Sequence, residues 1–257
     1  TSGKMVIMNE LIFHLDKKFK YEEIMIFSQT AKMNGDFPFA KPDYVFDTLD
    51  ALPKIIQARK ESGSKKHILL IFDDVAGMTS MGANGKRKTI KYNEELDFLS
   101  TTARHYHFSV IVSVQNRVMV SKVLRNNSSL SFIFTPKSRD DTQNIHNEYL
   151  GLARSRNEAQ AIFDSVYSKP FNTLVVEGYK SGVRNVTDYV SEYIAPFPLR
   201  KYKTHSLRKA KREQSKAKKK KKQEEEMFKQ QEKANTLGLN FRVSIYSDEI
   251  RRRTQQN

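Results

Sequence analysis

The most constraining feature of this chain is the stretch from His67 to Asp74, which reads His-Ile-Leu-Leu-Ile-Phe-Asp-Asp. Five consecutive apolar residues are typical of a strand that is buried on both faces of a parallel sheet. Asp73 and Asp74 follow at its end, and two adjacent carboxylates are costly to hold unless a cation or a water network compensates their charge. A magnesium ion that holds a nucleotide phosphate is the commonest reason for this arrangement.

A second signal lies at the start of the chain, which reads Thr-Ser-Gly-Lys-Met over residues 1–5. A phosphate-binding loop has the pattern G-x-x-x-x-G-K-[ST], in which backbone N–H groups surround the phosphates and the lysine supplies a positive charge. Gly3 and Lys4 match its end, and apolar residues at helical spacing follow over 5–15, so a helix N-terminus would face the same anion. We expect the preceding strand and the first glycine to lie upstream of Thr1. The predicted contacts to nucleotide phosphates are Ser2, Gly3, Lys4 and Met5.

Met5 departs from this pattern. The residue after the lysine should be Ser or Thr, whose hydroxyl binds magnesium, and a thioether is a poor ligand for that hard cation. Two interpretations stay open. Either water takes the place of the hydroxyl and hydrolysis is slower, or the chain has lost hydrolysis.

Strand-like and helix-like segments alternate along the chain. Apolar runs predict strands at 24–27, 68–73, 108–114, 131–134 and 174–176. Helices are expected over 5–15, from a cap at Asp50 through Ala58, and from Asn93 to about Tyr106. This alternation predicts right-handed crossovers and an α/β fold with a parallel sheet flanked by helices.

Two segments are rich in positive charge. Residues 75–92 contain three glycines and the run Lys86, Arg87 and Lys88, and we expect a mobile basic loop there. The net charge of the chain is +16, and residues 200–222 hold 13 Lys or Arg against one Glu, so they carry +12 of it. We therefore expect a core over 1–198 and a basic tail, disordered or helical, over 199–257. Such a tail suits a polyanion such as nucleic acid, although a solvated tail or a localisation signal explains it equally well. The candidate contacts in the tail are Lys218, Lys219, Lys220, Lys221 and Lys222.

The composition excludes two classes of protein. The chain has no cysteine, which argues against a disulfide-stapled secreted protein and fits a reducing interior. It has no run of 18 apolar residues and no signal-peptide pattern, so we expect an intracellular protein that makes no membrane contact.

Four further roles follow from position along the predicted sheet. Asp73 would join the magnesium shell through water, and Asp74 would orient or deprotonate the attacking water. Gln115 ends the neighbouring strand, within reach of a γ-phosphate. Arg104 precedes that strand and would stabilise transition-state charge on a neighbouring subunit, with Arg125 as a weaker candidate. Alternatively, these residues are turn aspartates, a strand-end glutamine and solvated arginines.

In this order the motifs resemble the FtsK–HerA class of P-loop motor ATPases, and within it the poxvirus-type virion DNA-packaging ATPases of large DNA viruses and their small relatives. The likeness covers residues 1 to about 180. It is carried by the segments 26–32, 34–36, 68–74, 100–106, 110–115 and 125–127.

The resemblance implies a RecA/ASCE-like P-loop NTPase fold, ATP and Mg²⁺ as ligands, and a homo-oligomeric ring that threads double-stranded DNA. It gives Gly3 and Lys4 to phosphate and Asp73 to magnesium. Asp74 would be the catalytic acid, a position that the class more often fills with Glu. It also implies Arg104 as arginine finger and Gln115 as sensor.

The same resemblance implies viral capsid or portal-type proteins as partners, and a location in the host cytoplasm (the viral factory) or the virion. The basic loop would then face a central pore. Two alternatives stay open. One is a degenerate P-loop protein that binds DNA without hydrolysis, and the other is a related helicase or DNA-transfer motor.

Overall fold

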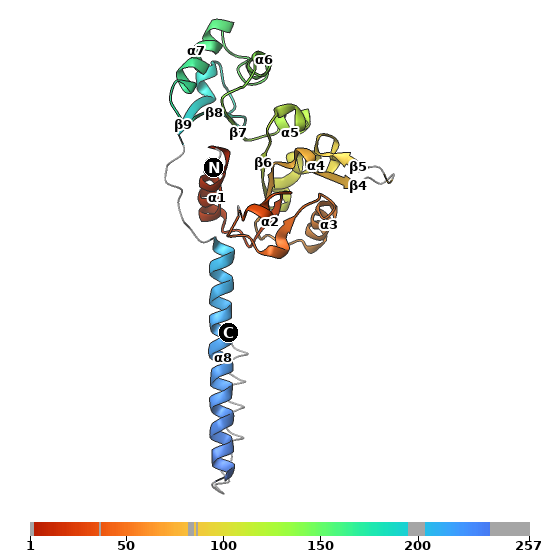
Figure 1. Ribbon diagram of the computed structural model, residues 1–257, viewed down its shortest axis with the longest axis vertical. Coiled ribbons are helices and arrows are strands. Elements are labelled where there is room, and N and C mark those ends of the chain that lie inside the picture. Colours follow the sequence, from red (N-terminus) through yellow and green to blue (C-terminus); the bar gives the residue numbers. More distant parts are fainter. Residues whose placement is uncertain (1–2, 36, 82–84, 86, 195–203, 237–257) are drawn as a thin grey trace. The chain divides into compact units, whose positions relative to one another are not determined.

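The computed structural model describes residues 3–35, 37–81, 85, 87–194 and 204–236. The chain divides into two compact units, Thr1–Leu207 and Arg208–Asn257. Figure 1 labels their elements. The first unit contains the candidate site and all three β-sheets of the described residues.

A four-stranded parallel sheet of order β2-β1-β3-β6 forms the centre of the first unit. Its strands are β1 (Glu23–Phe27), β2 (Val45–Phe46), β3 (Ile68–Asp73) and β6 (Phe108–Ser113). Every residue of β3 is buried, because it lies between β1 and β6 and is covered on both faces. The α/β fold with a parallel sheet is therefore confirmed.

Helices cover both faces of this sheet. α1 (Gly3–Phe19) packs on one face, and α3 (Leu52–Ser62) and α4 (Glu94–Thr102) pack on the other. Side chains of a strand alternate between faces. Accordingly, Leu69 and Ile71 share a core cluster with Met8 and Ile12 of α1. The opposite cluster joins Leu70 and Phe72 to Leu52, Ile56, Leu96 and Leu99. Asp73 is next in the alternation, so it belongs to the α1 face.

The helix boundaries follow local chemistry, with one correction. Asn93 caps α4 as predicted, since its Oδ1 accepts a hydrogen bond from Leu96 N at 2.9 Å. The predicted cap at Asp50 is wrong, because α3 begins after Ala51 with Pro53 in its first turn. Asp50 Oδ1 instead accepts from Met81 N at 2.9 Å.

The expectation of a mobile loop over 75–92 is also wrong for the residues that the structure describes. They form the 3-10 turn η2 (Val75–Gly77), the antiparallel pair β4 (Thr79–Met81) and β5 (Arg87–Thr89), and the turn η3 (Ile90–Tyr92). The buried Asn93 amide donates to Ser80 Oγ at 3.0 Å and so anchors this hairpin. The sequence did not predict this strand pair for two reasons. Its residues are mainly polar or glycine, and three-residue strands are too short to show a periodic pattern.

A second sheet lies in the C-terminal half of the first unit. Its strands are β7 (Leu130–Ile133), β8 (Asn172–Glu177) and β9 (Val190–Ile194), and they pair antiparallel in that order. The strands predicted at 131–134 and 174–176 therefore exist, but they do not belong to the parallel sheet. Two helices, α6 (Arg139–Tyr149) and α7 (Arg156–Tyr167), connect β7 to β8. A single crossover helix would favour a parallel return, whereas this helix pair brings the chain back antiparallel.

The remaining helices are α2 (Ala31–Asn34), α5 (Lys122–Asn126) and α8 (His205–Thr236). The second unit consists, in its described part, of α8, so the basic tail is helical as far as Thr236. The weak apolar patch noted at 237–246 lies outside the described residues. None of the helices in the described part of the chain is long and apolar enough to cross a membrane.

Candidate active site

The carboxyl ends of β3 and β6 bring two predicted residues into contact. Asp73 is in register with Ser113, and Asp74 N donates to Ser113 O at 3.2 Å. The Gln115 amide then donates to both carboxylate oxygens of Asp74, at 2.9 and 3.1 Å. Residues 41 positions apart thus form one polar pair at the edge of the sheet.

Asp74 adopts an unusual backbone conformation. Its φ of 49° and ψ of 45° lie in the left-handed region, which a non-glycine residue adopts at some cost and which Asp tolerates better than most. This turn ends β3 and directs the Asp74 side chain to an exposed position, where Gln115 orients it. Strained backbone of this kind is concentrated at functional sites.

Asp73 has a different environment from its neighbour. It is only 9% exposed and belongs to the α1 face of the sheet, whereas Asp74 is exposed. Two adjacent carboxylates are therefore separated, one inside the fold beside α1 and one at its rim. This separation reduces their mutual repulsion and allows them different roles.

The N-terminus of α1 reaches the same edge. Lys4 Nζ donates to Val114 O at 3.1 Å. A Cβ built on Gly3 would lie 3.5 Å from the Phe134 ring, directly after β7. The first turn of α1 thus lies at the carboxyl ends of β6 and β7. The Lys4 ammonium group is bound one residue before Gln115, and the N–H groups of this turn are free of intrahelical partners by construction.

Met5 packs into the hydrophobic core. It contacts the cluster on the α1 face, which contains Met8, Ile12 and Ile71. The position where the loop pattern requires a hydroxyl therefore contributes apolar packing and offers no oxygen ligand. Ser2 lies outside the described residues.

The donors at this edge fit a magnesium ion that is held mainly by water and phosphate. Mg²⁺ in phosphate-transfer sites takes one or two carboxylates and completes its shell with water and phosphate oxygens. Asp73 supplies one such carboxylate at the end of β3. Among the described residues there is no group of three or more His, Cys, Asp or Glu that would make a cage from protein ligands alone.

One side chain at this edge was missed by the sequence analysis. Gln29 follows β1, and its Oε1 lies 3.1 Å from the place that a Cβ would take on Gly77, in the turn after Asp74. A larger residue at 77 would displace Gln29, so the glycine permits this close approach. The order of parallel strands places Gln29, two residues after β1, at this edge, but its approach to Gly77 joins two chain segments and is not contained in the sequence pattern.

Arg104 does not join this cluster within its own chain. It is exposed in the turn η4 (Ala103–Tyr106), immediately before β6 begins. Gln115 lies beyond the other end of the same strand, which separates the two residues by roughly 20 Å at 3.3 Å per residue. Arg104 therefore lies at the opposite end of β6 from the Asp74–Gln115 pair of its own chain.

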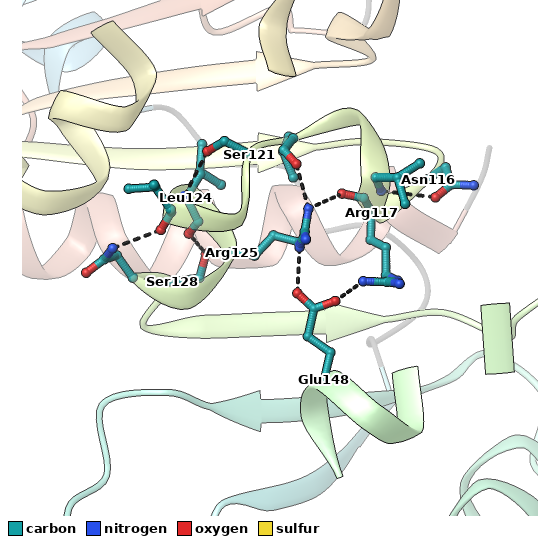
Figure 2. Close-up of polar contacts among 11 residues, drawn as sticks. Asn116, Arg117, Ser121, Leu124, Arg125, Ser128 and Glu148 are labelled. Carbon is teal, nitrogen blue, oxygen red and sulfur yellow. Dashed lines mark hydrogen bonds and ion pairs between the residues drawn. The ribbon is translucent and has the colours of Figure 1, made fainter. Parts of the chain in front are cut away.

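Arg125, the weaker finger candidate, is already bound within the chain. Figure 2 shows it between the carboxylate of Glu148 and two backbone carbonyls. Its Nε lies 2.5 Å from Glu148 Oε1, and its Nη1 donates to Val120 O at 2.6 Å and to Arg117 O at 3.1 Å. Arg117 pairs with the second oxygen of Glu148. These contacts join the segment after Gln115 to α6, beside the second sheet.

The basic candidates lie on two elements. In the hairpin, Arg87 is exposed and Lys88 forms an ion pair with Glu94, while Lys86 lies outside the described residues. In α8, the side chains of Lys218, Lys219, Lys220 and Lys222 are exposed, and the side chain of Lys221 lies outside the described part.

Comparison with known proteins places the fold. No protein-family model and no curated protein matches the sequence. The solved structure of B204, the DNA-packaging ATPase from Sulfolobus turreted icosahedral virus, is similar with a TM-score of 0.51 and 13% identity, over 76% of this chain and 92% of that one. The genome packaging NTPase B204 from Sulfolobus turreted icosahedral virus 2, in complex with AMPPCP, is similar with a TM-score of 0.49 and 17% identity, over 74% of this chain and 90% of that one. The chain therefore has the α/β fold of a viral packaging ATPase.

Proposed function

We propose that the chain is an ATP-driven motor that translocates double-stranded DNA, and that it packages viral DNA into a capsid. One observation carries the proposal: Lys4, Asp74 and Gln115, chosen from sequence, lie at one sheet edge in a fold shared with a DNA-packaging ATPase. Ligands in α/β proteins bind at the carboxyl ends of the strands, which is where these side chains lie.

Each residue at this edge has a distinct task. Lys4 leaves the Val114 carbonyl to bind the β- and γ-phosphates, assisted by the N–H groups of the first turn of α1. Asp73 would hold a magnesium ion through water, and Asp74 would orient the attacking water and accept its proton. Magnesium, when bound, neutralises charge on the phosphate oxygens. Gln115 releases one oxygen of Asp74 when a γ-phosphate offers its amide a better acceptor.

The phosphate-binding loop requires a strand that leads into Gly3. Within the described residues, β6 and β7 each pair on one side only. α1 begins at the carboxyl ends of both strands. A strand leading into Gly3 would therefore pair with the unpaired side of β6 or of β7.

The position of Arg104 favours an oligomeric ring of the FtsK–HerA type. It lies at the opposite end of β6 from Asp74, so it suits the transition state in a neighbouring subunit. The poxvirus-type packaging role, with capsid or portal-type partners in the viral factory or virion, belongs to this proposal. It rests on the motifs in residues 26–127.

The hairpin β4–β5 connects this site to DNA. β4 begins five residues after Asp74, separated from it only by η2 and Met78. A change in the Asp74 turn on hydrolysis therefore moves the base of a hairpin that carries Lys86, Arg87 and Lys88. Contacts from these residues to DNA phosphates would be independent of sequence and sensitive to salt.

A second function is favoured by Met5. Because this side chain packs in the core, α1 supplies no hydroxyl to magnesium, and the chain could bind DNA and nucleotide without hydrolysis. A helicase or DNA-transfer motor shares the chemistry of the first proposal. Detection of the protein in purified virions separates packaging from these roles.

The test is the ATPase rate of the native gene product with and without double-stranded DNA. We expect hydrolysis that DNA stimulates and that Lys4→Ala abolishes, while Lys54→Ala, an exposed lysine of α3, leaves the rate unchanged. If no hydrolysis is found, or if the Lys4→Ala rate equals the wild-type rate, the motor function is excluded.

A further inference from the structure

The first half of α8 is a dense array of positive charge. Ten of the fifteen residues from Arg208 to Lys222 are Lys or Arg, and one is Glu. The segment is helical, and those of its cationic side chains that are described are exposed, except Lys209, which is half-buried. None of the core clusters among the described residues includes a residue beyond Leu207. The described residues of α8 from Arg208 onward are therefore not stabilised by packing in a core.

Its charges repel one another along the helix. Cations stand four residues apart in the pairs 208/212, 212/216, 216/220 and 218/222, and each such pair destabilises a helix by about 0.2–0.5 kcal/mol. Two opposite-charge pairs, Lys220–Glu224 and Lys222–Glu226, oppose this repulsion, each at 3.8 Å. An anionic partner along the helix would remove the remaining repulsion.

We propose that residues 208–222 of α8 bind the phosphate backbone of double-stranded DNA and become more helical when they do so. The segment is about 22 Å long at 1.5 Å per residue, and a DNA duplex presents one negative charge per about 1.7 Å. Eight of its ten cations are lysines, which contact phosphates as point charges without reading base edges.

The composition excludes a membrane surface as the main partner. A helix that lies in a lipid interface needs a face of Leu, Phe or Trp opposite its cationic face. Residues 208–222 contain no large apolar side chain. A rod-like polyanion in water fits this helix better than a lipid headgroup layer does.

The start of α8 is attached to the helix that carries Lys4. Thr204 is fully buried, and His205 N donates to Asp16 Oδ2, near the end of α1, at 2.7 Å. Leu207 packs on the cluster that includes Met8 and Ile12. This inference rests on the proposed function and deepens it, because it names a second segment of the same chain that contacts DNA.

The test measures DNA affinity against salt concentration for the full chain and two charge-matched variants. One variant replaces Lys218, Lys219, Lys220 and Lys222 by Gln, and the control replaces the exposed Lys32, Lys54, Lys65 and Lys66 by Gln. Each released phosphate counterion contributes about 0.9 to the slope of log Kobs against log[salt]. We expect the α8 variant, which lacks four cations, to lower the slope by about 3.6 relative to the control. Equal slopes for the two variants would overturn the proposal.

Circular dichroism supplies an independent readout. We expect a 20-base-pair duplex to increase the helical signal of the wild-type chain and to leave that of the α8 variant nearly unchanged. Anionic vesicles that produce the same increase at equal charge, or self-association that the α8 variant abolishes without a change in DNA affinity, would contradict DNA as the partner. Lys4→Ala should retain the wild-type slope, so a failed motor function and a failed α8 contact give different results.

Discussion

The two ends of the parallel strands differ in what they present. At the carboxyl ends, Asp74 and Gln115 form an exposed polar pair beside Lys4. At the amino ends, aromatic rings pack together. The ring centroid of His67 lies 5.1 Å from that of Phe19 and 5.2 Å from that of His107. The same strands thus carry chemistry at one end and packing at the other, as the topology of parallel α/β sheets favours.

Backbone strain occurs at both ends and does not by itself identify the site. His107 has a φ of 57°, close to the 49° of Asp74. His107 ends the turn before β6, and its ring packs on His67. Asp74 directs its carboxylate to the exposed edge, where the Gln115 amide binds it. The functional interpretation of Asp74 depends on this placement together with its conformation.

The largest expected effect is the loss of hydrolysis at the carboxyl end. Asp74→Asn keeps the left-handed backbone and an acceptor for Gln115, but it removes the base, so kcat should fall by about 10² to 10⁴-fold. Steady-state ATPase assays of the native gene product measure this. Asp43→Asn, in the exposed turn Pro42–Tyr44, should be neutral. A kcat within a factor of two of wild type would remove Asp74 from the mechanism.

The amino end should respond in the opposite way. Arg59 is buried, donates from Nε to Tyr106 O at 2.8 Å, and lies over the Phe108 ring. Arg59→Ala should lower the free energy of unfolding by about 2 kcal/mol, through the lost hydrogen bond and the cavity. Denaturant unfolding measures this, with Lys54→Ala on the same helix as the control. The variant should keep its ATPase activity at low temperature, where it stays folded. A loss of activity without a loss of stability would show that the amino ends of the strands also contribute to catalysis.

A smaller effect is expected where the carboxyl end meets the second sheet. Glu148 pairs with both Arg117 and Arg125, and the three side chains are 15–21% exposed. Glu148→Gln leaves two half-buried arginines without a counter-charge and should destabilise the fold by about 1–2 kcal/mol. Differential scanning calorimetry measures the shift, and Glu225→Gln, which changes an exposed glutamate of α8, controls for lost charge. An unchanged melting temperature would show that the pairs contribute no net stability.

The smallest effect concerns pH. Burial, followed by the nearby Arg156, lowers the pKa of His146, which stacks on Phe163 at 4.7 Å. Because the folded pKa lies below the unfolded value of about 6.5, the unfolded state binds more protons in acid. Stability is therefore fully present above pH 6.5 and is lost as the pH falls below it.

His146→Leu should flatten this dependence between pH 7 and pH 5, by about 1.4 kcal/mol for each unit of pKa shift removed. Urea unfolding at several pH values provides the measurement. His67, whose pKa is also lowered by burial, keeps its own contribution at the amino end of the sheet. If the free energy of unfolding depends on pH in the same way for wild type and His146→Leu, another group causes the acid sensitivity.

Sequence patterns predicted the parts of the fold that depend on local chemistry. The apolar run before Asp73 gave a strand that is buried along its whole length, and Asn93 gave a helix cap. These predictions succeeded because burial and capping act over a few residues. Gln115 was predicted at the end of the strand beside β3, but its hydrogen bonds to Asp74 were not predicted.

Other features depend on contacts that a linear pattern does not contain. The direction of β8 is set by the α6–α7 pair, while its own apolar residues suit either pairing. The sequence pattern showed only that Met5 lacks the hydroxyl that would bind magnesium. The structure shows that its side chain packs against the core cluster on the α1 face. Gln29 was missed because its approach to Gly77 depends on two chain segments.

The most direct test of the account is calorimetric titration of the native gene product with ATP, in the presence and absence of magnesium. The account predicts that magnesium tightens ATP binding by at least about tenfold, or ~1.4 kcal/mol, and that Asp73→Asn removes this gain while Lys4→Ala weakens binding under both conditions. Equal affinity with and without magnesium in the wild-type chain would contradict the metal–nucleotide site at the carboxyl ends of β3 and β6.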